Sequence, residues 1–218
     1  MEKIMKNLVI IGAGNLGKEA AWLVEDINKQ KPKYLILGFL DDDAERLGTE
    51  FYGYRILGNT HSLSELKQKT PVSAVIAIQD GQARKQIVEQ NQEFDDWETI
   101  IHPTAVVAPT AKIGKGSILF PQVTISVDTK LGDFGLYYIH STICNDCTAG
   151  DYVSVMSGVQ VSERVSIGSQ SYLAAGCCIY PHKILGEKVF VSVGATVIKD
   201  CADQEKVKGR GNLFSIFK

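Results

Sequence analysis

An apolar residue recurs at every sixth position through the second half of the chain, and no other feature restricts the possible folds so strongly. No charged residue falls on this series, which consists of Ile101, Val107, Ile113, Leu119, Ile125, Leu131, Tyr137, Ile143, Ala149, Val155, Val161, Ile167, Leu173, Ile179, Leu185, Val191 and Val197. A second period lies on top of the first. Glycine recurs every 18 residues, at Gly114, Gly132, Gly150, Gly168 and Gly186. Three six-residue segments therefore form one turn of a regular structure.

A period of six excludes an α-helix, whose period is 3.6, and it does not fit a sheet of simple hairpins. It predicts a solenoid in which short strands run around a triangular prism and every sixth side chain points inward. Successive coils then pair as parallel strands about 4.8 Å apart. We expect the repeated glycines to support one corner of each coil, because glycine tolerates tight or left-handed backbone.

The first half of the chain alternates predicted strands with predicted helices, which is typical of a parallel sheet in a Rossmann-like domain. The expected strands are residues 6–11, 34–40, 72–78 and 97–101, and the expected helices follow residues 16, 62 and 82. The pattern changes at His102-Pro103. We therefore predict a Rossmann-like domain over 1–102, a β-helix over 103–202 and a tail over 203–218 that packs on the last coil or on a neighbouring subunit.

A glycine-rich loop connects the first predicted strand to the first predicted helix. Gly12, Gly14 and Gly17 form a G-x-G-x-x-G motif in the strand-to-helix context where backbone N–H groups and a helix N-terminus bind phosphate. Asp41 or Asp42, after the second strand, could bind a ribose or a base. The glycines alone leave three interpretations open: a dinucleotide, a nucleotide-sugar, or a tight turn without a ligand.

Composition restricts the possible functions less strongly than these motifs do. The net charge of −2 without a basic block argues against a nucleic acid or an anionic membrane as partner. The apolar runs are too short for a membrane span, and the N-terminus has no signal-peptide pattern, so we expect a cytoplasmic protein. Cys144 and Cys147 form a C-x-x-C, but they fall in different columns of the prism. We therefore expect reduced, packed thiols and no metal site.

Several segments resemble the bacterial sugar acyltransferases of the sialic acid O-acetyltransferase type, which include UDP-4-amino-sugar N-acetyltransferases. They are Ile10–Gly14, Gly38–Asp42, Ile101-His102-Pro103 and the Gly-Ala-x-Val-x-Lys-Asp motif at 194–200. The resemblance implies a Rossmann-like domain followed by a left-handed parallel β-helix of the hexapeptide-repeat type, assembled as a homotrimer. It also implies acetyl-CoA as acyl donor, in a groove between two subunits.

The same resemblance suggests residues for each role. Ala175, Val193 and Gly194 would line the groove for acetyl-CoA, and Gly12, Gly14, Gly17, Asp41 and Asp42 would hold the nucleotide part of the substrate. The family's general-base histidine is Asn145 here, followed by Asp146, and a second histidine found in some members is Ser154. His140 lies five residues before Asn145 and is a possible substitute. Asn145, Asp146 and His140 are therefore the catalytic candidates.

Three functions follow as hypotheses. The first is an acetyl-CoA-dependent acyltransferase that modifies an amino sugar or a nucleotide-linked sugar in surface-glycan biosynthesis. The second is a catalytically inactive homologue that serves as a scaffold binding a sugar nucleotide or an acyl-CoA, because Asn145 cannot take up a proton at neutral pH. The third is an NAD(P)-dependent oxidoreductase, which a prism without a deep cleft does not favour.

Overall fold

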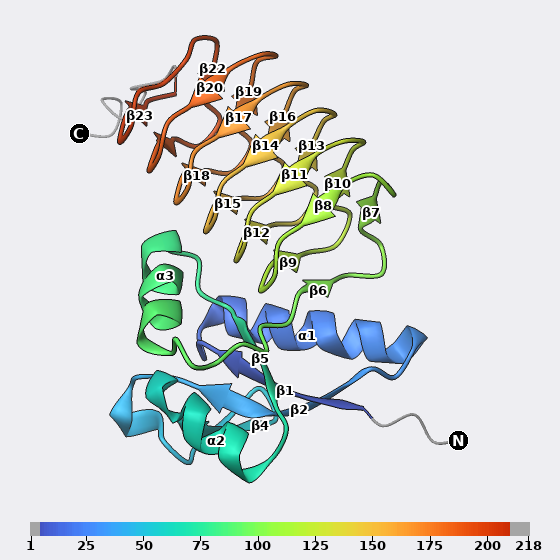
Figure 1. The fold of residues 1–218 in the computed structure, drawn as a ribbon, viewed down its shortest axis with the longest axis vertical. Helices are drawn as coiled ribbons and strands as arrows, with labels where there is room; N and C mark the ends of the chain where they lie inside the picture. The colour runs from blue at the N-terminus through green and yellow to red at the C-terminus, as the bar shows by residue number, and fades with distance from the viewer. Residues whose placement is uncertain (1–4, 210–218) are drawn as a thin grey trace, which may run out of the picture.

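The computed structural model describes residues 5–209, which form an α/β domain and a three-sided prism (Figure 1). The α/β domain contains a five-stranded sheet in the order β3-β4-β2-β1-β5. All neighbours in it are parallel except the β3–β4 hairpin. The strands are β1 (Lys6–Ile11), β2 (Tyr34–Leu40), β3 (Glu50–Phe51), β4 (Tyr54–Gly58) and β5 (Ser73–Ile76).

Helices cover both faces of this sheet. Helix α1 (Asn15–Gln30) buries Ala20, Leu23 and Val24 with the side chains of β1 that point to one face. Helices α2 (Leu63–Lys69) and α3 (Gly81–Gln90) pack with the β1 side chains that point to the other face. Two short 3-10 helices, η1 (Ala44–Arg46) and η2 (Thr60–Ser62), complete the domain. The expected Rossmann-like arrangement is therefore confirmed.

Two details of the sequence prediction were wrong. The β3–β4 hairpin, in which β4 also pairs with β2, was missed because its strands are short. Residues 97–101 do not form one strand. The N–H of Glu98 donates to Ala74 of the sheet, whereas the N–H of Ile100 donates to Ser117 of the prism. At Thr99 the chain stops pairing with the sheet of the α/β domain and begins to pair with the prism.

The prism has three faces built from two-residue parallel strands, which confirms the predicted left-handed parallel β-helix. The first face contains β6 (Ile100–Ile101), β9 (Ile118–Leu119), β12 (Leu136–Tyr137), β15 (Ser154–Val155), β18 (Tyr172–Leu173), β21 (Phe190–Val191) and β23 (Lys206–Val207). The second contains β7 (Val106–Val107), β10 (Thr124–Ile125), β13 (Thr142–Ile143), β16 (Gln160–Val161), β19 (Cys178–Ile179) and β22 (Thr196–Val197). The third contains β8 (Lys112–Ile113), β11 (Lys130–Leu131), β14 (Thr148–Ala149), β17 (Ser166–Ile167) and β20 (Ile184–Leu185).

The six-residue series forms the core of the prism. Every member from Leu119 to Val197 is buried. Ile101, Val107 and Ile113 in the first coil are less covered, because no earlier coil packs on them. At the other end, β23 extends the first face by pairing with β21. The rest of the predicted tail, residues 210–218, lies outside the described residues.

The 18-residue glycines have a different role from the one predicted. None of them has a positive φ. Each instead lies against the next coil: a Cβ added to Gly168 would lie 2.4 Å from the carbonyl carbon of Gly186. Glycine is required there because two backbones approach closely, and left-handed backbone is not the reason.

The left-handed residues form three other columns, one along each corner, and most of them are not glycine. The corner between the first and second faces has Gln122, His140, Gly158, Gly176 and Gly194, and the corner between the second and third has Asp128, Asp146, Arg164 and His182. The corner between the third and first faces has Gly116, Phe134, Tyr152, Gln170 and Lys188. Their backbone N–H groups often donate to a carbonyl of the preceding coil, as Asp146 does to Val127 at 3.1 Å. These corners are therefore held partly by backbone, and the exposed side chains at Asp128, Asp146 and Arg164 contribute little to the repeat.

Candidate functional site

The carboxyl ends of β1, β2 and β5 meet at one edge of the sheet, where α/β domains usually bind ligands. The glycine-rich loop lies there between β1 and α1. Gly12 has a φ of +101° and Gly17 would place a Cβ 2.1 Å from the carbonyl oxygen of Gly12, so the loop is too tight for larger residues at either position. Gly14 faces open space and is the N-cap of α1, with no side chain capping the helix. The N-terminus of α1 is therefore available to an anion.

Asp41 and Asp42 lie beside this loop and both make hydrogen bonds within the chain. Asp41 accepts from the backbone N–H of Ala13 at 2.7 Å. Asp42 accepts from the N–H and the hydroxyl of Thr60 at 2.8 and 3.2 Å. Asp41 therefore shapes the glycine-rich loop directly, whereas Asp42 holds η2. The structure brings Asp41 next to the predicted nucleotide site and gives Asp42 a role in the loop behind it.

Sequence reasoning missed two cations near the same edge. The Lys18 ammonium and the Arg46 guanidinium lie 5.4 and 4.8 Å from the centre of the Phe51 ring. Arg46 also lies 3.6 Å from the Asp41 carboxylate. Lys18 belongs to the first turns of α1, so both cations add positive charge beside the loop. Phe51 is in the β3–β4 hairpin, and without that hairpin the cluster could not be predicted.

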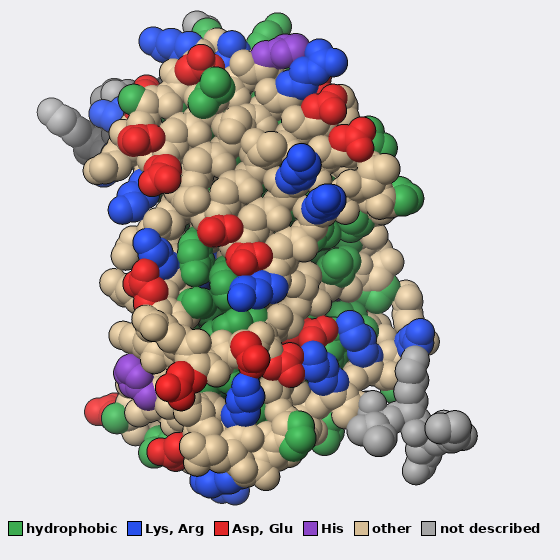
Figure 2. Space-filling model, viewed as in Figure 1, with side chains coloured by type: hydrophobic (Ala, Val, Ile, Leu, Met, Phe, Trp, Pro, Cys, Tyr) green, Lys and Arg blue, Asp and Glu red, His purple; other side chains and the backbone are tan. Residues whose placement is uncertain are grey.

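A cavity of about 410 Å³ opens where the α/β domain meets the first face of the prism. Its residues are Gln79, Asp80 and Gly81, between β5 and α3, and Ser154, Gln170, Tyr172 and Phe190 of the prism. The amide of Gln79 donates to the Tyr172 hydroxyl, and the Tyr172 and Phe190 rings stack with centres 5.4 Å apart. Figure 2 shows hydrophobic side chains gathered between the prism and the α/β domain. The cavity offers an aromatic surface beside amide and hydroxyl groups.

The catalytic candidates do not form one cluster. Asn145 and Asp146 lie together on the corner between the second and third faces, where the Asn145 amide donates to the Asp146 carboxylate at 2.8 Å. The Arg164 guanidinium, one coil further, lies 3.7 Å from the same carboxylate. His140 lies on the corner between the first and second faces. The structure therefore pairs Asn145 with Asp146 and separates both from His140.

Asp146 also lines a groove of about 430 Å³ along the third face. The other lining residues are Thr110, Lys112, Asp128, Lys130 and Thr148. Lys112 and Lys130 are directly paired on neighbouring strands. Because lysines and aspartates alternate around it, the groove is polar without a strong net charge.

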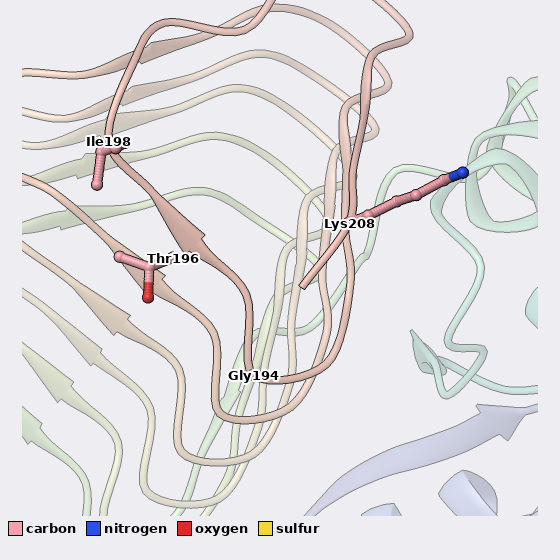
Figure 3. A pocket seen from close by; sticks show the side chains of 4 residues that line it. All are labelled: Gly194, Thr196, Ile198 and Lys208. Carbon is pink, nitrogen blue, oxygen red and sulfur yellow. The ribbon is translucent and has the colours of Figure 1, made fainter. Parts of the chain in front are cut away.

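The three residues predicted to line the acetyl-CoA groove share one corner. The N–H of Gly194 donates to the carbonyl of Ala175 at 3.0 Å, and the Val193 side chain is 72% exposed. Beside them, Gly194, Thr196, Ile198 and Lys208 line a hollow of about 310 Å³. Thr196 and Ile198 project from the second face, and Lys208 extends in the opposite direction (Figure 3). This corner thus presents exposed apolar surface along the prism.

The cysteines and the helices limit other functions. All five cysteines are unpaired, and the buried Cys147 donates to the carbonyl of Ser162 at 3.1 Å. Within residues 5–209, no group of three or more His, Cys, Asp or Glu side chains could share a metal ion. None of the helices in that range is long and apolar enough to cross a lipid bilayer.

Comparison with known proteins gives matches to both halves of the chain. Residues 7–91 match the family described as the PglD N-terminal domain. UDP-N-acetylbacillosamine N-acetyltransferase of Bacillus subtilis (strain 168) is 31% identical over 119 residues. That alignment covers 53% of this chain and 51% of the relative, so it spans about half the length of the curated protein.

Solved structures match over nearly the whole chain. The acetyltransferase domain of PglB from Neisseria gonorrhoeae FA1090, in complex with acetyl coenzyme A, has a TM-score of 0.84 and 27% identity. The match covers 93% of this chain and 96% of that one. PerB from Caulobacter crescentus, in complex with CoA and GDP-perosamine, has a TM-score of 0.81 at 23% identity, with 92% of each chain covered, and shares the fold.

Proposed function

We propose that the chain is a hexapeptide-repeat sugar acetyltransferase, which transfers an acetyl group from acetyl-CoA to an amino sugar or a nucleotide-linked sugar in surface-glycan biosynthesis. One observation carries the proposal. The whole arrangement of α/β domain and prism matches the PglB acetyltransferase domain, which was solved with acetyl coenzyme A. The five unpaired cysteines agree with the reducing cytoplasm as the site of this reaction.

The carboxyl edge of the sheet suits the nucleotide part of the acceptor. The uncapped N-terminus of α1 would receive a phosphate, with Lys18 and Arg46 adding positive charge. Gln79 follows β5 at the same edge, and it also lines the cavity against the prism. A nucleotide-sugar bound at Gly12–Gly17 would thus extend its sugar into this cavity. Tyr172 and Phe190 would pack on the sugar ring there.

A second copy of the chain would complete the site. Asn145 and Asp146 lie on the corner opposite the first face, so they cannot reach the cavity of their own prism. A neighbouring prism could present that corner to the cavity. Exposed apolar side chains near the second and third faces support such packing: Val127 (47%), Tyr180 (60%), Ile184 (59%) and Ile198 (63%). We therefore favour the homotrimer that the family resemblance implies, with acetyl-CoA between two prisms along Ala175, Val193 and Gly194.

The reaction needs a nucleophile, a route for its proton and a stabilised oxyanion. The lone pair of a neutral acceptor amine or hydroxyl attacks the thioester carbonyl, and the carbon–sulfur bond then breaks to release CoA as a thiolate. The acceptor's proton passes to a base, which returns it to the thiolate sulfur. Asn145 can donate a hydrogen bond but cannot take up a proton. Asp146 is the adjacent carboxylate, so it or a group of the substrate would accept the proton. Backbone N–H groups of a coil would stabilise the oxyanion.

Release of CoA thiol from acetyl-CoA, measured with UDP- and GDP-linked amino sugars, tests the proposal. We expect turnover that falls at least tenfold in Asp146→Asn and changes less than twofold in His140→Ala. We expect Asn145→His to raise the rate, because an imidazole titrates near neutral pH. Failure to release thiol with any acceptor, together with binding of both ligands, would contradict an enzymatic function.

That last outcome would support the second candidate, a scaffold that binds a sugar nucleotide or an acyl-CoA without turnover. One observation favours it: Asn145 and Ser154 stand where the family resemblance predicts imidazoles. Gain of activity in Asn145→His from a silent parent would establish that the site lost only its base.

A further inference from the structure

Arg84 is the largest fully buried side chain among the described residues, with 1% of its surface exposed. It lies in the first turns of α3, at the contact between the α/β domain and the prism. Burial of a guanidinium is costly unless its N–H groups are hydrogen-bonded. Here they meet six acceptors, all of them neutral: five main-chain carbonyl oxygens and the Ser154 hydroxyl.

These acceptors come from three separate segments. Nη1 donates to the carbonyls of Ile78 and Gln79, in the connection between β5 and α3, at 2.8 and 2.9 Å. Nε donates to the carbonyl of Phe134 at 2.9 Å. Nη2 reaches the next coil, at the carbonyl of Tyr152 at 2.8 Å. One side chain therefore fastens the loop after β5 to two successive coils of the prism.

The same contacts determine the walls of the cavity at the domain junction. The Ser154 hydroxyl receives a hydrogen bond from Arg84 and donates one to the carbonyl of Gln79 at 2.8 Å. Both Gln79 and Ser154 line the cavity. Gly81, also in its lining, would place a Cβ 2.2 Å from the carbonyl oxygen of Tyr152, so the loop and the coil are in direct contact. A shift of the loop would change the cavity's width and the direction of its polar groups together.

We propose that Arg84 is a positioning residue for the transfer reaction, which sets the geometry of the cavity for the acceptor sugar without touching it. This inference rests on the proposed function. The planar fork of five donors is what joins three segments, and a lysine of the same charge could not reproduce it. In the proposed arrangement, the nucleotide and the body of acetyl-CoA bind outside this cavity, so we expect their affinities not to depend on Arg84.

Arg84→Lys tests the inference, and Arg84→Met replaces it if the lysine variant does not fold. We expect kcat/KM for a UDP-4-amino-sugar to fall at least tenfold, with KM for acetyl-CoA within twofold of the parent. The affinity for UDP alone should also stay within twofold, whereas the additional affinity of the UDP-amino-sugar is lost. The matched control is Ile87→Ala on the next turn of α3, which removes a buried apolar side chain but none of the hydrogen bonds of Arg84. It should lower Tm but leave kcat/KM unchanged well below Tm.

Hydrogen exchange gives a readout that does not require turnover. Amides of residues 78–82 and 152–156 should exchange faster in Arg84→Lys than in the parent, and should keep the parent rate in Ile87→Ala. If the parent shows no acetyl transfer, the proposed function fails and this exchange pattern still decides whether Arg84 fixes the cavity. Unchanged exchange in both segments, or a kcat/KM for the sugar within twofold when only Tm falls, would overturn the inference.

Discussion

The α/β domain and the prism fix their loops in different ways. In the α/β domain, single side chains accept backbone N–H groups: Asp41 from Ala13, Asp42 from Thr60 and Asp80 from Gln82. In the prism, the corners are held largely by hydrogen bonds between the backbones of successive coils. These aspartates of the α/β domain are therefore part of the fold, whereas exposed left-handed residues of the prism such as Asp128 and Arg164 depend less on the identity of the side chain.

This difference bears on Asn145, which stands where the family resemblance predicts a histidine, on the corner between the second and third faces. Its corner has Asp128, Asp146, Arg164 and His182 in the same left-handed conformation, although these side chains differ in charge and size. The fold tolerates them all because the N–H and C=O groups of the backbone carry the repeat. We therefore expect substitutions of the exposed side chains at this corner to change the stability of the prism little.

The largest effect is expected where the prism does depend on a particular residue. In Gly168→Ala, the new Cβ would lie 2.4 Å from the carbonyl carbon and oxygen of Gly186. Forcing the coils apart should cost about 3 kcal/mol. Gly158→Ala is the matched control, because Gly158 has a φ of +67° but no atom within 4 Å of its added Cβ. It should cost about 1 kcal/mol. Chemical denaturation measures both, and equal costs would show that close approach of the coils is not the constraint.

The next effect is expected at Asp42 in the α/β domain. Asp42→Ala leaves the buried Thr60 without an acceptor for its N–H and hydroxyl, which should cost about 2 kcal/mol. Asp43→Ala is the control, since Asp43 is exposed and accepts only the N–H of Glu45, at 3.1 Å. Thermal unfolding measures the contribution of Asp42 to stability, and titration with UDP measures its contribution to nucleotide binding. A loss of UDP affinity without a loss of stability would make Asp42 a ligand-binding residue.

Much of the fold could be predicted from the sequence, because both halves have local periods. The six-residue series specified the prism, and alternating apolar runs specified the parallel sheet. The role of the 18-residue glycines could not be predicted correctly, because their constraint comes from a coil 18 residues away in sequence but adjacent in space.

The sites were less predictable for the same reason. The loop at Gly12, Gly14 and Gly17 is contiguous and could be recognised, and Asn145 and Asp146 are neighbours in sequence. The cavity at the domain junction depends on contacts such as that of Gln79 with Tyr172, which are 93 residues apart. Arg84 had no sequence signal, since an arginine in a helix is usually on the surface.

A smaller effect is expected if a side chain that caps the N-terminus of α1 is added. Gly14 has a φ of −98° and free space around it, so Gly14→Asp can place a carboxylate at the N-cap without strain. This should stabilise the domain by about 1 kcal/mol. The same carboxylate would repel phosphate, so affinity for UDP should fall about tenfold. Gly14→Ala, which adds no charge, is the control. Higher stability with unchanged UDP affinity would contradict a phosphate site at this helix.

The smallest effect is expected at an ion pair near the connection between the α/β domain and the prism. Salt weakens such pairs. Glu98 lies just before the prism and accepts from Lys6 at 2.6 Å and from the Tyr34 hydroxyl at 2.5 Å. Burial alone would raise the pKa of Glu98, but these hydrogen bonds outweigh it and the pKa is lowered. A lowered pKa means that the carboxylate stabilises the fold above the pKa of a free glutamate, about 4.3, and that this contribution is lost as pH falls through the folded value.

Glu98→Gln should therefore cost about 1 kcal/mol at pH 7, since Lys6 is partly exposed and the pair is screened by solvent. The difference from the parent should shrink as pH falls below the pKa of a free glutamate, about 4.3, and through the lower folded pKa. Unfolding by urea between pH 3 and 7 measures it, with Asp95→Asn as the control because Asp95 pairs with Lys67 on the surface. A difference that stays constant from pH 7 to pH 3 would mean that Glu98 acts by packing rather than by charge.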